Sequence, residues 1–527
     1  MPSLKAMTCP QQLAGRCRLI ASLVLVILWV LLYIPNLRTS PGWYGDEFVS
    51  LIAGRSMLDG SLANRSLHYS FFSVFTNYQP ACNFLYAVFA AFFSGGDILG
   101  ARFLSTLAAL ACAQMAFHML ASRGRMLVGF CAALIFLTAP QSLIHFRWVY
   151  PHLFVATGAL LAGLLLDRRR TAKRDWLIGL GCAIGALCHL IAVHVTAIAT
   201  LVSWRRPRSW LAIILPPVAV FLLALAYGYF ISGPQLFLDL QEVAASYAGH
   251  GGPAPFISKI RNFFIFFSWD WFHLFSLVSL VVVAFQRRWG LFFFTFLIAF
   301  AIIQNRPELP VFYYQASIFL PLLCVIQAYT VQAGAVLFSS RFLPPKFRRW
   351  FVRGLAVTLS CIFLPQSLHR AWTNSITPRC QYLVTPSIAD LENAAAWINE
   401  HTKKNDLVIA YWDAGYLLRG RWADIMQAAA WQYGSCQDFY PRPRTKDEFI
   451  FPANLKEAKY VVVGPLDLQF AYSQGTAPQL VQMAKLADWP QVWNSPTVTI
   501  LRNPKYPDEG RPELGPQPPP APLKDEK

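Results

Sequence analysis

An acidic pair follows the first long apolar segment of the sequence. Asp46 and Glu47 lie in the run 42–48, just after an apolar stretch over 19–36. A carboxylate at a partly dry interface can have a raised pKa and accept a proton from a substrate hydroxyl, which is general-base chemistry. An acidic pair at the start of a helix is also favoured by the helix dipole, and on spacing alone this structural alternative is the more common one. The surrounding elements must decide between the two.

The composition indicates that these elements form a membrane protein. Of the 527 residues, 55% are hydrophobic and only 14% are charged, whereas a soluble domain carries about 25% charged residues. The apolar residues come in long runs, and a helix that crosses a bilayer needs about 20 of them. The 45 Lys and Arg outnumber the 27 Asp and Glu, but the positive charges lie at the ends of apolar runs. They therefore indicate orientation in the membrane and no nucleic-acid partner.

The basic clusters predict which loops lie on which side of the membrane. Because loops rich in Lys and Arg stay in the cytoplasm, the first helix begins inside, and the run 176–204, basic at both ends, is a hairpin of two short passes. The run 80–96 must contain a hairpin or a re-entrant turn around 94–97. Counting crossings so that every basic cluster lies inside gives about 11 to 13 membrane helices over 1–366. The external polar regions are 37–79, 233–261 and everything beyond 366. The basic clusters expected inside lie at 123–125, 167–174, 205–208, 287–288 and 346–353.

The composition becomes that of a water-soluble fold from about residue 380. A capping pattern at Ser387 predicts a helix through His401. Apolar runs predict strands, and a further amphipathic run predicts a helix. These segments are 407–410, 460–464 and 498–501 for the strands and 478–488 for the helix. We therefore expect a small α/β domain over 380–503, followed by a disordered tail, rich in proline and charge, over 504–527. Cys380 and Cys436 could form a disulfide if this domain faces an oxidising compartment.

In this topology the acidic pair supports a family resemblance. The chain combines a single first helix, an external loop opening with Asp46 and Glu47, and Arg55 within the stretch 53–60. With the multi-helix body and the outer α/β domain, it resembles the GT-C superfamily of membrane glycosyltransferases. The most similar branch contains the protein O-mannosyltransferases, the aminoarabinose transferases and the Rgt-type lipopolysaccharide sugar transferases. The resemblance covers most of the membrane body and is specific in the first loop. It implies a GT-C-like, α-helical polytopic membrane fold with a small C-terminal α/β domain outside the cytoplasm.

The resemblance also implies a reaction. Asp46, with Glu47 beside it, would be the catalytic base that deprotonates an acceptor hydroxyl for inverting attack on the anomeric carbon of a polyprenyl-phosphate sugar. The implied partners are this donor, an acceptor that is a glycan, a lipid or a protein, and membrane lipid. No cofactor is implied, and the chain has neither a Walker-type loop nor a Rossmann motif after a soluble strand. No metal is assigned, because no His or Cys pair has ligand spacing, although some members of the family use a divalent cation.

The departing phosphate of such a reaction needs cationic or hydrogen-bonding partners. The predicted topology places a small set of suitable residues near the outer face. They are Arg55, Arg147, His152, Arg306, Tyr313 and Tyr314. Each also has a structural alternative, as a lipid-headgroup contact or an interfacial anchor. The chain departs from the family pattern at 77–82, which lacks lysine, and before Tyr150, where relatives often carry an acidic residue.

Two other functions compete with a membrane glycosyltransferase. A transporter or lipid flippase would suit His189 and His194, since a histidine within a membrane segment is a functional candidate. The polar features gather at one face, however, and no inverted repeat is evident. A noncatalytic envelope assembly subunit would use Asp46 and Glu47 only as a helix cap. The leading hypothesis is a hexosyl- or pentosyltransferase that spans the bacterial inner membrane several times, with its C-terminal domain outside the cytoplasm.

Overall fold

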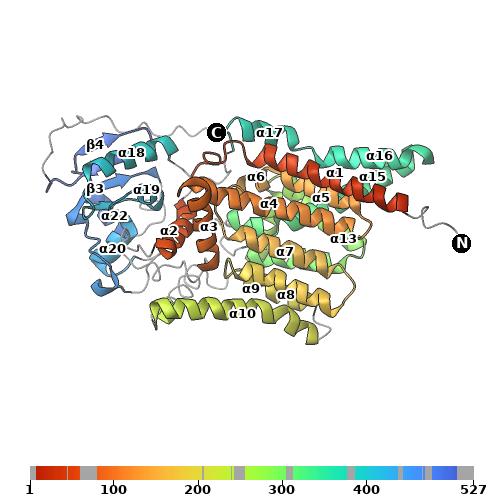
Figure 1. Cartoon of the computed structure of the whole chain (residues 1–527), viewed down its shortest axis with the longest axis horizontal. Coiled ribbons are helices and arrows are strands. Elements are labelled where there is room, and N and C mark those ends of the chain that lie inside the picture. The colour runs from red at the N-terminus through yellow and green to blue at the C-terminus, as the bar shows by residue number, and fades with distance from the viewer. Residues whose placement is uncertain are drawn as a thin grey trace. The chain divides into compact units, whose positions relative to one another are not determined.

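The chain forms two compact units in the computed structural model (Figure 1). The membrane unit comprises Met1–Pro41, Asn77–Tyr227 and Gly251–Thr377, and the α/β unit comprises Gly42–Thr76, Gly228–His250 and Pro378–Lys527. The structure describes residues 8–43, 45–59, 80–203, 207–234, 236–238, 240–241, 256–303, 313–376, 386–436, 443–465, 467–468 and 477–506. Arg306, Cys380, most of the predicted tail and parts of both predicted external loops lie outside the described residues.

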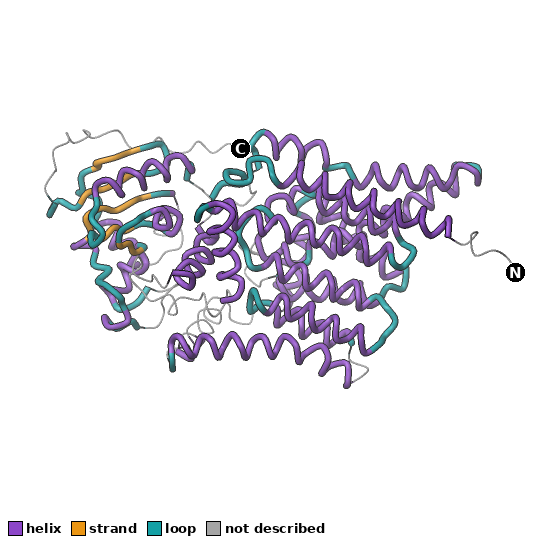
Figure 2. The backbone as a smooth tube through the Cα atoms, in the orientation of Figure 1, coloured by secondary structure: helices purple, strands orange, loops and turns teal. Residues whose placement is uncertain are grey.

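Helices make up the described part of the membrane unit (Figure 2). The first half contains α1 (Thr8–Tyr33), α3 (Pro80–Ser94), α4 (Ile98–Ala121), α5 (Met126–Thr138), α6 (Pro140–His145), α7 (His152–Leu166), α8 (Ala172–Ala186) and α9 (Ala192–Val202). The second half contains α10 (Pro207–Ser232), which continues into the α/β unit, α12 (Phe256–Ser268), α13 (Trp271–Phe285), α14 (Trp289–Ile302), η5 (Tyr313–Ile318), α15 (Leu320–Phe342), α16 (Pro345–Ser360) and α17 (Leu364–Trp372).

Several of these helices are long and apolar enough to cross a bilayer. Within the described ranges there are five such spans, and a sixth if the bent pair α12–α13 counts as one. Five more apolar helices have 10–17 residues. A helix of 13 residues rises only about 20 Å, less than the roughly 30 Å of the hydrocarbon core. The polytopic α-helical fold is confirmed, with fewer full-length spans than the number of apolar runs predicts.

Contacts at both ends of α1 show that α1 and α4 run antiparallel. Arg18 donates to the carbonyl of Ala121 (3.0 Å) at the end of α4, and Arg38, just after α1, pairs with Asp97 (2.7 Å) at the start of α4. The predicted turn at 94–97 joins α3 to α4, and its glycines Gly95 and Gly96 have φ values of 61° and 95°, which favour glycine. In the middle of α3, the ring of Tyr86 lies 5.9 Å from that of Phe154 at the start of α7, between centroids. The turn expected at 94–97 is present, and the re-entrant path of the run 80–96 stays a prediction.

The predicted hairpin over 176–204 is confirmed by a contact between its two ends. α8 and α9 are separated by a break at Leu187–Ile191, where the Nδ1 atom of His189 accepts from the backbone N–H of Ile191 (3.0 Å). The hydroxyl of Ser209 in α10 donates to Asp175 in α8 (2.6 Å). Because the start of α10 meets the start of α8, α9 must return to the side from which α8 came.

The apolar run over 262–285 is not one helix. It breaks at Trp269 and Asp270, and the axes of α12 and α13 differ there by 116°. Asp270 is the N-cap of α13 and accepts from the backbone N–H of His273 (2.9 Å). An N-cap residue has non-helical dihedrals, so this residue ends one helix and begins the next.

The α/β unit is built around a five-stranded sheet of order β2-β1-β3-β5-β4. β1 pairs in parallel with β2 and β3, and β5 pairs antiparallel with β3 and β4. The elements are α2 (Gly45–Asp59), α18 (Ile388–His401), β1 (Leu407–Ile409), α19 (Trp412–Leu417), β2 (Arg421–Ala423), α20 (Ile425–Tyr433), η6 (Lys446–Glu448), η7 (Leu455–Glu457), β3 (Ala458–Val463), α22 (Ala477–Ala484), β4 (Gln491–Asn494) and β5 (Thr499–Arg502).

Most of the elements predicted in this unit are present. Ser387 caps α18 by accepting from the backbone N–H of Asp390 (3.4 Å), and the three predicted strands correspond to β1, β3 and β5. β2 and β4 were not predicted, because a strand of three or four residues is too short to show alternation. The sulfur of Cys436 accepts from the side-chain amide of Gln479 (2.9 Å), and its pairing with Cys380 stays a prediction.

Candidate functional site

The acidic pair lies in the first turn of α2, which packs against α19 and the residue before it. Gly45 makes this close packing possible, because a Cβ atom there would lie 2.2 Å from the Cε1 atom of Tyr411. Phe48, one turn later in α2, lies 5.2 Å from the ring of Tyr416 between centroids. The segment after α1 therefore contributes a helix to the α/β unit, and the start of that helix is fixed against the loop after β1.

The two carboxylates differ in accessibility. Asp46 is partly exposed, whereas Glu47 is fully buried. Tyr411, which is 2% exposed, lies within electrostatic reach of Asp46. Its burial raises its pKa well above the usual value, and the negative charge of Asp46 raises the pKa further. Tyr411 therefore stays protonated beside Asp46, where its hydroxyl remains a hydrogen-bond donor.

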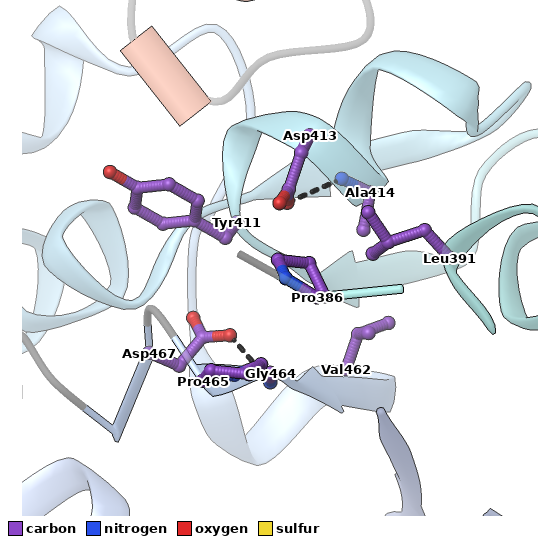
Figure 3. A pocket seen from close by; sticks show the side chains of 9 residues that line it. All are labelled: Pro386, Leu391, Tyr411, Asp413, Ala414, Val462, Gly464, Pro465 and Asp467. Carbon is purple, nitrogen blue, oxygen red and sulfur yellow. Dashed lines mark hydrogen bonds between the residues drawn. The ribbon is translucent and has the colours of Figure 1, made fainter. Parts of the chain in front are cut away.

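A small pocket lies at the carboxyl ends of β1 and β3 (Figure 3). It has a volume of about 10 Å³ and is lined by Tyr411, Asp413, Gly464 and Asp467, among others. β1 lies between β2 and β3. The chain passes from β1 to β2 on one side and then crosses to β3 on the other, and ligands of open α/β sheets bind where the strand order reverses in this way. The pocket is polar on the side that the two aspartates form.

Both aspartates of this pocket are buried and held by the backbone. Asp413 accepts from the N–H of Ala414 (2.7 Å), and Asp467 accepts from the N–H of Gly464 (2.8 Å). Burial raises the pKa of Asp413 to about 6 and that of Asp467 to about 8. The charge of Asp413 adds to the second shift. At neutral pH Asp467 is therefore mostly protonated. Sequence reasoning missed both residues, although each follows a predicted strand.

The predicted arginines have different environments. Arg55 is exposed and lies in α2 with its guanidinium carbon 5.9 Å from the ring centroid of Tyr416. Arg147 is fully buried in the membrane unit. It donates to the carbonyls of Leu32 (3.1 Å) and Pro35 at the end of α1. The contacts of Arg147 satisfy carbonyls that a helix end leaves without partners. Arg306 lies outside the described residues, as do the side chains of Tyr313 and Tyr314 in η5.

His152 lies in a buried aromatic group of the membrane unit. It is 1% exposed at the start of α7, and its ring centroid lies 4.3 Å from that of His189 in the α8–α9 turn. The two histidines are far apart in the sequence and meet because the hairpin returns to this end of α7. Among the described residues, no group of three or more His, Cys, Asp or Glu side chains is placed to hold a metal ion.

Comparison with solved structures identifies the fold. No family model and no curated protein matches the sequence. ArnT from Cupriavidus metallidurans in the apo state has a TM-score of 0.55 and 12% identity, over 93% of this chain and 98% of that one. The chain has a GT-C-type fold. ArnT bound to undecaprenyl phosphate also has a TM-score of 0.55, with 12% identity over 92% of this chain and 97% of that one.

A third structure extends the same likeness to an oligosaccharyltransferase. AglB from Archaeoglobus fulgidus, in complex with an inhibitory peptide and a dolichol-phosphate, has a TM-score of 0.52 and 12% identity, over 90% of this chain and 72% of that one. The GT-C resemblance stated from the sequence is thus confirmed at the level of the fold.

The membrane unit of this GT-C-type fold also contains a polar cluster that sequence reasoning missed. Asp270 contacts the Nδ1 atom of His273 (2.8 Å) and accepts from the side-chain amide of Gln141 (2.6 Å). Together with His145, His273 and Gln141 line a cavity of about 10 Å³ whose other walls are apolar. These residues come from α6, the α12–α13 break and α13, so no local sequence pattern connects them.

Proposed function

We propose that the protein is an integral membrane glycosyltransferase that transfers a sugar from a polyprenyl-phosphate donor to an acceptor outside the cytoplasm. The observation that carries this proposal is the likeness to ArnT over 93% of this chain and 98% of that one. One of the ArnT structures contains undecaprenyl phosphate. A lipid-linked donor also explains the chain's large apolar body, because the polyprenyl tail needs a bilayer or an apolar groove.

In the proposed mechanism Asp46 is the general base. It takes the proton of an acceptor hydroxyl, whose oxygen attacks the anomeric carbon of the donor sugar. The bond from that carbon to the phosphate oxygen breaks, and the lipid phosphate leaves with the electron pair. Attack from the face opposite the leaving group inverts the anomeric centre. The partial exposure of Asp46 supports this role, and the full burial of Glu47 favours a positioning role for that residue.

The departing phosphate is the proposed ligand of the basic and aromatic candidates. Arg55 is the most accessible of those described, since it is exposed on the same helix as Asp46. Arg147 would act from a position that the end of α1 fixes, and its Nε atom has no hydrogen-bond partner among the described residues. His152, Arg306, Tyr313 and Tyr314 complete the proposed set. The proposed location is the bacterial inner membrane, with the α/β unit outside the cytoplasm.

Mass spectrometry of envelope lipids and glycans, with and without the protein, tests the proposed function. We expect one glycan, lipid or protein to lack a sugar when the protein is absent. The purified full chain, supplied with that acceptor and a panel of polyprenyl-phosphate sugars, should then release polyprenyl phosphate as product forms. Uptake of labelled substrate into vesicles without covalent product would favour a transporter, and an unchanged envelope with no release in vitro would favour an assembly subunit.

A further inference from the structure

Three arginines surround one carboxylate at the end of the membrane unit where α4 and α7 finish. The carboxylate of Asp167 lies 2.7 Å from Arg288, 3.5 Å from Arg123 and 3.7 Å from Arg125. We call these three residues the arginine cluster. They come from the α4–α5 and α13–α14 turns, and Asp167 begins the α7–α8 turn. Three connections far apart in the sequence therefore meet at one point.

The arginine cluster carries more positive charge than its counter-ion balances. Asp167 supplies one negative charge against three positive charges. Burial, with a smaller effect from the charge of nearby Arg168, lowers the pKa of Arg123 to about 10, although Asp167 acts in the opposite direction. Arg123 still carries its charge at neutral pH, so the repulsion persists in the folded protein.

The other carboxylates described in the membrane unit have partners of their own. Asp97 pairs with Arg38, Asp175 with Arg174, and Asp270 with His273. None of these pairs includes a member of the arginine cluster. Within the described residues, no other carboxylate of the membrane unit therefore balances the excess positive charge of the cluster. An anion from outside the chain could balance it.

The arginines are also held in place with donors to spare. The guanidinium of Arg288 stacks on the ring of Tyr329 (4.1 Å), and the hydroxyl of the same tyrosine accepts from Arg125 (2.9 Å). The Nε atoms of Arg123 and Arg288 are buried and have no hydrogen-bond partner in the described part of the chain. A buried donor without an acceptor destabilises the folded state, and a phosphate offers several acceptor oxygens to such donors.

We propose that the arginine cluster binds the phosphate group of an anionic ligand, either a lipid headgroup or free phosphate. The cluster lies where apolar helices end, which is the depth of the headgroups in a bilayer. The Arg125 side chain, which is 39% exposed, leaves an approach from solvent. None of the arginine cluster or Asp167 is among the residues proposed for glycosyl transfer, so this site is a separate proposal.

Lipid retention by the purified full chain tests this site, with Arg287 and Arg288 as matched positions. Arg287 is exposed and Arg288 is not, so Arg287→Gln and Arg288→Gln remove the same charge from neighbouring positions. In nanodiscs of phosphatidylcholine with added phosphatidylglycerol, native mass spectrometry should show at least about a fivefold loss of bound phosphatidylglycerol for Arg288→Gln. Arg287→Gln should stay within about twofold of the unchanged protein. Equal losses in both variants, or no loss in either together with no effect of inorganic phosphate, would overturn the proposal.

Two further arms separate a ligand site from a structural clamp and identify the phosphate source. Asp167→Asn removes the competing negative charge, so retention of phosphatidylglycerol should rise; an unchanged or lower retention contradicts the site. Inorganic phosphate added to phosphatidylcholine nanodiscs should raise the melting temperature and displace phosphatidylglycerol if free phosphate is the ligand, and should do neither if the lipid is. Arg125→Gln replaces Arg288→Gln if the latter does not fold.

Discussion

At the scale of single residues, the position of Asp46 depends on its neighbour Gly45, which has no side chain. Gly45 lets the buried ring of Tyr411 lie against the first turn of α2. The ring of Tyr411 lines the pocket that holds Asp413 and Asp467, while its hydroxyl stays protonated near Asp46. One tyrosine therefore connects the proposed base with the carboxyl ends of the parallel strands.

We predict that Gly45→Ala destabilises the α/β unit. The new Cβ atom would lie 2.2 Å from a ring carbon of Tyr411, and such overpacking typically costs about 1–3 kcal/mol. Gly354→Ala in α16 is the matched control, because a Cβ there meets nothing within 4 Å and helix propensity favours alanine by about 1 kcal/mol. Chemical unfolding followed by tryptophan fluorescence measures both. Equal stability of the two variants would contradict the close packing of α2 on Tyr411.

The buried carboxyl of Asp467 predicts a pH dependence of stability. Its pKa rises from 3.8 to about 8 on folding, so between these values the folded state binds more protons than the unfolded state. Stability from this group is complete below about pH 4 and is lost as the pH rises through about 8. Asp467→Asn should flatten this decline. Thermal unfolding between pH 5 and pH 8.5 checks it, and parallel curves for the two proteins would show that Asp467 does not titrate as stated.

At the scale of elements, the break between α12 and α13 brings polar groups into an apolar segment. Asp270 caps α13, and its carboxylate also contacts His273 and Gln141. The bend of 116° allows residues of α6 and α13 to line one cavity. A single straight helix over the same residues would leave Asp270 without its N-cap position.

We predict that Asp270→Ala weakens this element more than Asp270→Asn does. Alanine removes the N-cap acceptor, which costs about 0.5–2 kcal/mol, together with the contacts to His273 and Gln141. Asparagine keeps a side-chain acceptor for the backbone N–H of His273 and loses only the charge. Thermal unfolding in detergent ranks the two variants. The reverse order would show that the charge matters more than the cap.

At the scale of the whole molecule, several basic loops meet at one end of the membrane unit. Asp167 and the arginine cluster bring together the loops at 123–125, 167–174 and 287–288. Arg168 also donates to Ser122 (3.3 Å). Loops rich in Lys and Arg remain cytoplasmic. The proposed orientation therefore places this end of the membrane unit inside.

Labelling of single cysteines from each side of the membrane checks this orientation. Arg169 and Asp488 are both exposed and belong to the membrane unit and the α/β unit respectively. In a background in which all 11 native cysteines are replaced by serine, a membrane-impermeant thiol reagent added to intact cells should label Asp488→Cys and spare Arg169→Cys. Labelling of Arg169→Cys alone would invert the topology and remove the proposed mechanism.

Local sequence patterns predicted most helices, strands and turns. The features that these patterns missed depend on contacts between residues far apart in the sequence. The cap at Ser387, the turn at 94–97 and the hairpin over 176–204 each follow from neighbouring residues and their charges. The bend at Asp270 was missed because the apolar composition continues on both sides of it. The position of Tyr411 beside Asp46 could not be predicted, nor that of Asp467 in the same pocket as Tyr411, since these residues come together only through the pairing of β1 with β3.

The transfer activity of Asp46→Asn is the most direct test of the proposed general base. Asparagine keeps the size of the side chain but cannot accept the acceptor's proton, and general-base catalysis contributes about 10²- to 10⁴-fold. We predict that product formation falls at least about 100-fold while the same amount of folded protein reaches the membrane. Asp488→Asn, an exposed carboxylate of the same unit, should retain activity. Full transfer by Asp46→Asn would contradict the account.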